Sequence, residues 1–153
     1  MTGAPVVTFS KLRRISLDFE TTSIANLKKV GAPRYSEDES TRVLVAAWSV
    51  GNAPPRCWII GQDEPTELFA LAADPNVTFV AWNSAFERTV WRRTFARQWP
   101  NAPEIPIERW SCSMTRGLVW GLPRALDMAG AAIGTSVLKD ATGAKLMMKM
   151  SKP

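Results

Sequence analysis

Two acidic side chains, two residues apart, carry the clearest chemical signal in the sequence. Asp18 and Glu20 lie in the segment 12–20, where apolar and polar residues alternate. This period of two predicts a strand on which both carboxylates point to one side, with their Cα atoms ~7 Å apart. Such like charges repel each other unless a cation or open water separates them. The pair therefore predicts either a site for Mg²⁺ or Mn²⁺, which prefer oxygen ligands, or two exposed acids on a surface strand.

A third acid follows a second apolar segment. Val77–Trp82 reads as a buried strand, Asn83 lies at its end, and Glu87 falls in the first turn of a helix predicted from Ser84 to Gln98. Ser84 and Glu87 also have the spacing of a capping box, in which the glutamate accepts a hydrogen bond from the backbone at the start of the helix. Taken by itself, this segment favours a capping role for Glu87 over a catalytic one.

The elements that would position these acids form a mixed α/β layer fold with helices covering a central sheet. We expect one domain over residues 1–153, with a loose arm at 1–10, an ordered loop or short helical piece at 24–42, and a partly irregular tail at 135–153. Strands are predicted at 12–20, 43–50, 56–60, 77–82 and 107–111. Helices are predicted at 64–73, 84–98, 113–120 and 123–133.

Composition excludes several classes of site. The 153 residues contain no histidine, which removes Ser-His and Cys-His nucleophile pairs and most zinc sites with mixed ligands. The two cysteines form no CxxC motif, so we expect a reducing, cytoplasmic setting. No apolar stretch approaches the roughly 18 residues that a membrane span needs. The net charge of +5 is a weak indication of a polyanionic partner.

The two acidic motifs together resemble a known family. The sequence LDFETT at 17–22, followed by Asn83-x-x-Phe86-Glu87, is similar to the first two motifs of the DEDD 3′–5′ exonucleases, which have a ribonuclease H-like fold. From about residue 15 to 149, the chain resembles the proofreading exonuclease region of phage-type family A DNA polymerases. Neither short motif is specific alone, but both occur in order and on the expected elements.

This resemblance implies two-metal hydrolysis of a phosphodiester at the 3′ end of single-stranded DNA, with Mg²⁺ or Mn²⁺ as cofactor. Asp18 would bridge both ions, Glu20 would hold the ion that activates water, and Glu87 would support the second ion. Most relatives carry Asp at the position of Glu87. The resemblance further implies a polymerase region of the parent protein as a partner, and no membrane.

One part of the family pattern is missing. The third motif places Tyr or His four residues before a final metal-binding Asp. This chain has no histidine and a single tyrosine, Tyr35, while Pro123 and Ser136 stand four residues before Asp127 and Asp140. We therefore expect a domain that is C-terminally incomplete, truncated before the third motif, with weak metal binding and little nuclease activity. The alternatives are a non-catalytic nucleic-acid-binding or interaction module on the same fold, and a polymerase remnant without present function.

Arginines on the helix beside Glu87 are the candidates for phosphate contacts. Arg88 and Arg92 share one helical face, and Arg93 and Arg97 share another. They predict either a ridge that contacts phosphates or a solvated helix face. The residues that we expect to contact nucleic acid are Asn83, Phe86, Arg88 and Arg92.

Aromatic residues near the motifs are predicted to be core rather than stacking platforms. Trp82 and Trp91 lie in apolar patterns, and Phe19 points away from the side that carries Asp18 and Glu20.

Overall fold

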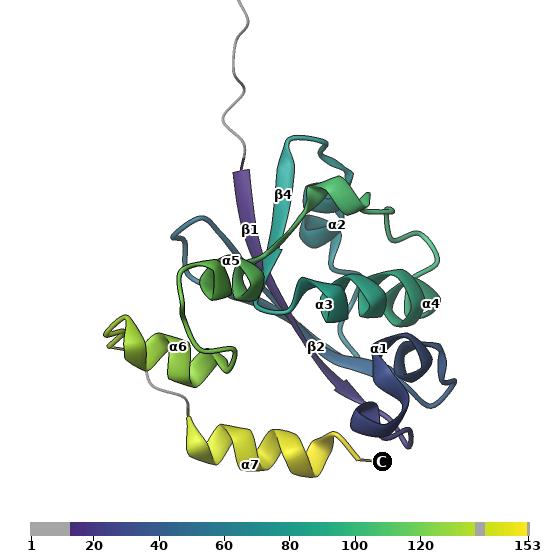
Figure 1. Cartoon of the computed structure of the whole chain (residues 1–153). Coiled ribbons are helices and arrows are strands. Elements are labelled where there is room, and N and C mark those ends of the chain that lie inside the picture. The colour runs from purple at the N-terminus through teal and green to yellow at the C-terminus, as the bar shows by residue number, and fades with distance from the viewer. Residues whose placement is uncertain (1–12, 137–139, 153) are drawn as a thin grey trace, which may run out of the picture.

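A five-stranded mixed sheet forms the centre of the protein (Figure 1). The computed structural model describes residues 13–136 and 140–152, so the arm expected at 1–10 lies outside the described residues. The strand order is β3-β2-β1-β4-β5, with β1 antiparallel to β2 and parallel to β4. The predicted mixed α/β fold is confirmed. The strands are β1 Arg13–Thr22, β2 Arg42–Val50, β3 Arg56–Ile59, β4 Val77–Ala81 and β5 Trp110–Cys112.

Helices lie in most of the connections between the strands and after the last strand. They are α1 Leu27–Glu37, α2 Thr66–Ala73, α3 Ser84–Val90, the π-helix η1 Trp91–Phe95, α4 Ala96–Gln98, the 3₁₀ turn η2 Ile107–Arg109, α5 Ser113–Val119, α6 Leu126–Ala132 and α7 Ala141–Met150. Among the described residues, no helix combines the length and the apolar character needed to cross a bilayer.

In three segments the structure gives more detail than the sequence-based prediction. The region 24–42 contains α1, which bends at Gly31, where φ is 75°, a value that favours glycine. The predicted strand 107–111 begins as the turn η2 and becomes extended only at Trp110. Within the tail that was expected to be partly irregular, residues 141–150 form α7, and Asp140 caps it by accepting a hydrogen bond from the Thr142 amide at 2.9 Å.

The core lies on one side of the sheet, between the strands and the α2, α3 and η1 helices. Phe19 packs on Phe95 with ring centroids 5.4 Å apart, and Trp91 packs on Phe95 at 5.3 Å, so both residues predicted as core are confirmed. Trp82 was predicted wrongly. It is only partly buried, outside this cluster, and its indole N–H donates to the Arg124 carbonyl at 3.0 Å.

One arginine ties three backbone segments together. The Arg109 guanidinium donates hydrogen bonds to the carbonyls of Leu71, Ala72 and Val77 at 3.1, 2.7 and 2.8 Å, which joins η2 to the end of α2 and the start of β4. We expect Arg109→Met, which keeps an apolar stem but no donors, to lower the free energy of unfolding by about 2 kcal/mol in urea titration. Arg56→Met, which removes an exposed ion pair with Glu67, is the matched control. Equal losses in both variants would contradict this role of Arg109.

Candidate active site

The first two acids project from the central strand of the sheet. Asp18 pairs with Ala47 and Glu20 with Val45 across the antiparallel ladder, and the register shifts directly after Glu20. Ile15, Leu17 and Phe19 are buried, while Asp18 is exposed and Glu20 is partly exposed. The predicted strand and its alternation are confirmed, and both carboxylates lie on the side opposite the core.

These two carboxylates repel each other. Burial raises the pKa of Asp18. Water reaches this side chain, but the surrounding protein removes part of its hydration. Partial burial also raises the pKa of Glu20, and the negative charge of Asp18 raises it further. Both shifts mean that nothing in the site offsets the negative charge of the ionised Asp18 and Glu20. A bound cation would offset it.

Glu87 is the most deeply buried of the three acids, with only 5% of its surface exposed. Its Oε2 atom has no hydrogen-bond partner among the described residues. Loss of hydration raises its pKa to about 7; its own backbone amide opposes this shift, and the charges of Asp18 and Cys112 add to it. Glu87 is therefore close enough to Asp18 for the two charges to interact.

The expected capping box is not formed. The N-cap of α3 is Asn83 rather than Ser84, and its side chain makes no capping hydrogen bond. Glu87 thus lacks the role that the local sequence favoured, and its buried oxygen is left for another partner. An unpartnered buried carboxylate of this kind needs either a proton or a cation.

Sequence reasoning missed Cys112, which lies beside Glu87. Its Sγ atom accepts from the Thr115 amide and donates to the Trp82 carbonyl, both at 3.5 Å. Burial alone would raise the pKa of this thiol, but hydrogen bonds from Thr115 and Ser84 outweigh burial and lower it to about 7. The signal was present: Cys112 directly follows the predicted strand 107–111, and the carboxyl ends of parallel strands gather at one edge of a sheet.

The three acids form two interacting pairs with Asp18 in common. The negative charge of Asp18 raises the pKa of both Glu20 and Glu87, so Asp18 interacts with each of the other two acids. Among the residues that the structure describes, no group of three acidic, cysteine or histidine side chains is arranged to hold one ion. The oxygen donors, the mutual repulsion and the unpartnered Glu87 oxygen nevertheless fit divalent cations.

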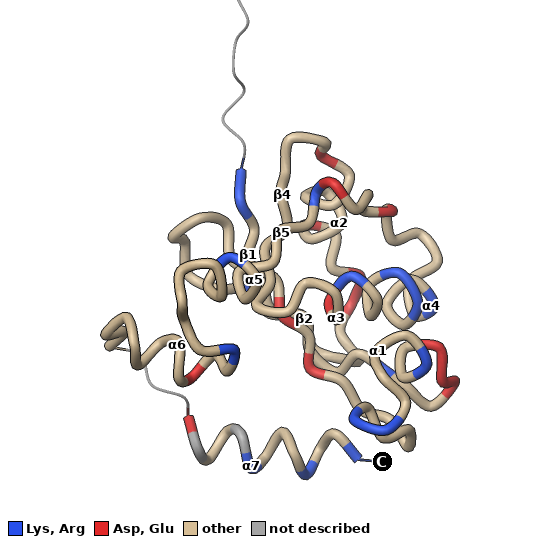
Figure 2. Tube along the Cα trace, viewed as in Figure 1, with Lys and Arg blue, Asp and Glu red and all other residues tan. Residues whose placement is uncertain are grey.

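The four residues expected at the nucleic acid lie at different depths. Asn83 is exposed, whereas Phe86 is partly buried with its ring 6.3 Å from the ring of Tyr35. Arg88 and Arg92 line a pocket on the outer side of α3 and η1. In Figure 2 the basic segments gather over α3, α4 and the neighbouring α1.

The other two arginines of this helix hold the fold together. Arg93 forms an ion pair with Glu37 at the end of α1. Arg97 donates to the carbonyls of Asp38 and Thr41 at 3.0 and 2.9 Å. Arg93 and Arg97 therefore join this helix to the end of α1 and the residues that follow it, while Arg88 and Arg92 line the pocket together with Arg93.

The single tyrosine is also engaged in the fold. Tyr35 is buried, and its hydroxyl shares a hydrogen bond of 2.8 Å with the Thr21 hydroxyl at the end of β1. Since the chain has no histidine, Tyr35 is the one side chain of the type that the missing third motif would supply, and it is committed to Thr21.

Comparison with known proteins agrees with the motifs and the sheet. No family model matches the chain. A DNA polymerase of Bacillus phage SP02 is 28% identical over 144 residues, which is 93% of this chain but 21% of the polymerase. The chain thus spans about a fifth of that relative.

Solved structures with the same fold include a nuclease from Brucella melitensis. NrnC with bound Mg²⁺ has a TM-score of 0.56 at 16% identity, covering 84% of this chain and 56% of that one. NrnC bound to pGG has a TM-score of 0.52 at 15% identity, with the same coverage. These likenesses show that the chain shares a ribonuclease H-like fold with these structures, and the similarity to the phage polymerase agrees with the two acidic motifs.

Proposed function

We propose that this domain removes nucleotides from the 3′ end of a single DNA strand in a metal-dependent reaction, as the proofreading part of a DNA polymerase. The observation that carries the proposal is the buried Glu87 carboxylate, which has an unpartnered oxygen and interacts with the charge of Asp18. The similarity to a phage DNA polymerase supports the DNA substrate and a polymerase region as partner. A cytoplasmic location is part of the same proposal.

Asp18, Glu20 and Glu87 would hold Mg²⁺ or Mn²⁺ through their carboxylate oxygens, with Asp18 shared. Two ions bound there would stabilise the attacking and leaving oxygens of an in-line displacement at phosphorus. The chain's own contribution is to keep the Glu87 oxygens out of water and close to Asp18. Asn83 and Phe86, at the start of α3, would contact the 3′ end of the DNA strand. The Mg²⁺ and pGG bound to NrnC support a cation and a nucleic acid at a site on this fold.

The reaction is expected to be slow. A water molecule at this site would lack a tyrosine or histidine to orient it, because the chain has no histidine and Tyr35 is hydrogen-bonded to Thr21. Misplacing a nucleophile by ~1 Å costs on the order of 10²-fold in rate.

The test is to incubate the chain with single-stranded DNA labelled at its 5′ end, in Mn²⁺ or in EDTA, and to follow product lengths on a sequencing gel. We expect slow, Mn²⁺-dependent shortening from the 3′ end, one nucleotide at a time. Fast and complete digestion would contradict the predicted weakness. Internal cleavage, or equal cleavage in EDTA, would contradict the exonuclease itself.

The second candidate is a binding module without catalysis. It is favoured by the absence, among the described residues, of three acids arranged around one point. Such a module would bind the strand equally well in EDTA, would take up no Mn²⁺ in equilibrium dialysis and would leave the DNA at full length.

A further inference from the structure

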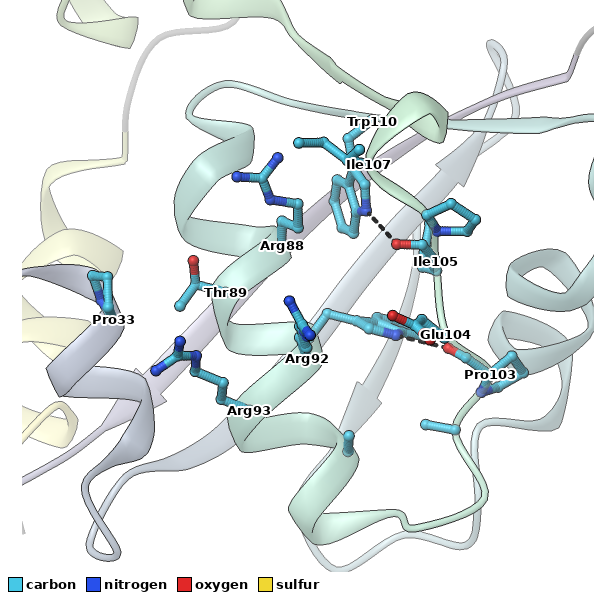
Figure 3. Close-up of a pocket in the computed structure, with 14 residues that line it drawn as sticks. Pro33, Arg88, Thr89, Arg92, Arg93, Pro103, Glu104, Ile105, Ile107 and Trp110 are labelled. Atoms are coloured by element: carbon cyan, nitrogen blue, oxygen red, sulfur yellow. Dashed lines mark hydrogen bonds between the residues drawn. The ribbon is translucent and has the colours of Figure 1, made fainter.

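A pocket of about 690 Å³ lies away from the acidic site, between α1, the α3–η1 helix and the segment 102–110 (Figure 3). None of Asp18, Glu20 and Glu87 lines it. Its walls combine cationic and apolar side chains. The lining residues that matter here are Arg88, Arg92, Arg93, Glu104, Ile107 and Trp110.

Two of the three cations in this pocket are available to a ligand. Arg93 is paired with Glu37, but no hydrogen bond or ion pair joins Arg88 or Arg92 to any other residue that the structure describes. Glu104, the one acid in the lining, is exposed and makes no ion pair within that part of the chain. Two unpaired guanidinium groups on one wall form a site for an anion with at least two negative groups.

The opposite wall is apolar and fixed in position. Trp110 is partly buried, packs on Phe79 with ring centroids 5.5 Å apart, and donates its indole N–H to the Ile105 carbonyl at 3.3 Å. Ile107 next to it is 58% exposed. In Figure 3 the Arg88 side chain extends beside the Trp110 ring, so a cation and an aromatic ring lie together at one end of the pocket.

The π-helical segment contributes to this arrangement. Arg92 and Arg93 belong to η1, where the helix is wider than an α-helix, and Arg88 lies just before it on α3. Arg92 and Arg93 both line the pocket, and of the two Arg93 also pairs with Glu37 on α1. Such π segments occur frequently at functional sites.

We infer that this pocket binds a stretch of single-stranded nucleic acid, with Arg88 and Arg92 contacting backbone phosphates and a base lying against Trp110 and Ile107. The inference rests on the proposed nucleic-acid substrate and adds a second contact region outside the acidic site. The volume of this pocket exceeds that of one phosphate ion. An inorganic anion would also make no favourable contact with the apolar wall. A base reaches such a wall only when it is unpaired, which favours a single strand over a duplex.

The test measures binding without catalysis, in EDTA and on an Asp18→Ala background, by fluorescence anisotropy of a short labelled oligothymidylate. We expect the double variant Arg88→Ala, Arg92→Ala to weaken binding about tenfold or more. The slope of log affinity against log salt concentration should become smaller by about one to two, because two phosphate contacts are lost. Arg14→Ala with Arg56→Ala removes the same charge from other surfaces and should change the affinity less than about twofold. Ile107→Glu, an exposed substitution, should weaken binding while leaving the thermal midpoint unchanged.

Equal affinities and salt slopes for the two double variants would overturn the inference. So would stronger displacement of the probe by polyglutamate than by unlabelled DNA, which would indicate an acidic polypeptide, or displacement by inorganic phosphate at equal phosphate concentration. Duplex DNA binding as tightly as the single strand would overturn the role of the apolar wall. Because metal and Asp18 are absent, failure of the exonuclease proposal would leave this binding intact, and failure of this inference would leave Mn²⁺-dependent shortening at saturating DNA unchanged.

Discussion

Replacing Asp18 by alanine is expected to lower the Mn²⁺-dependent shortening of single-stranded DNA by about 100-fold or more. Asp18 is the acid whose charge acts on both Glu20 and Glu87. Its loss would therefore remove a ligand from each of the two pairs, and loss of a supporting contact at a metal site typically costs roughly 10–100-fold by itself. Initial rates on 5′-labelled DNA give the activity, and equilibrium dialysis of Mn²⁺ gives the accompanying loss of metal binding.

Ser16→Ala is the matched control for this experiment. Ser16 is exposed on the same side of β1, two residues before Asp18, so the substitution tests the same strand without removing a carboxylate. We expect its rate and its Mn²⁺ binding to equal those of the unmodified chain. A rate for Asp18→Ala within about threefold of Ser16→Ala would contradict the assignment of Asp18 to the reaction.

The parts of the fold that were predicted correctly are those with a strong local pattern. Alternation at residues 15–20 identifies β1 and the side of the strand on which Asp18 and Glu20 lie, because a strand has only two faces. The hairpin of β2 and β3 follows from two apolar segments around a turn rich in proline and glycine. The arrangement of helices against a central sheet follows from the order in which strands and helices occur along the chain.

The parts that were missed depend on contacts between distant segments. The capping box at Ser84 is a local rule, but Glu87 is instead buried near Asp18 of β1, a neighbour that the local sequence does not reveal. Cys112 joins the same site because β5 is parallel to β4 and both end there. The π segment at 91–95 leaves no comparable signal, since its residues also suit an α-helix.

Replacing Glu87 by glutamine is expected to remove the contribution of this carboxyl group to the pH dependence of stability. The pKa of Glu87 rises from 4.5 in the unfolded chain to about 7 in the folded protein, so between these values the folded protein binds more protons than the unfolded chain. The contribution of Glu87 to stability is then greatest below pH 4.5 and is lost as the pH rises through 7. The full difference is about 3 kcal/mol in the absence of metal. Glutamine resembles the protonated acid in shape and cannot ionise.

Urea titrations in EDTA at pH 5 and pH 8 would measure this effect. Relative to the unmodified chain, the free energy of unfolding of Glu87→Gln should rise by about 2.5 kcal/mol more at pH 8 than at pH 5, while the exposed control Glu108→Gln should show no such difference. Mn²⁺ should stabilise the unmodified chain more strongly at pH 8, where Glu87 has lost its proton, and should stabilise Glu87→Gln less at that pH. A pH profile that the glutamine leaves unchanged would mean that Glu87 is ionised and already compensated in the folded protein, and its unpartnered oxygen would then offer no argument for a cation beside Asp18.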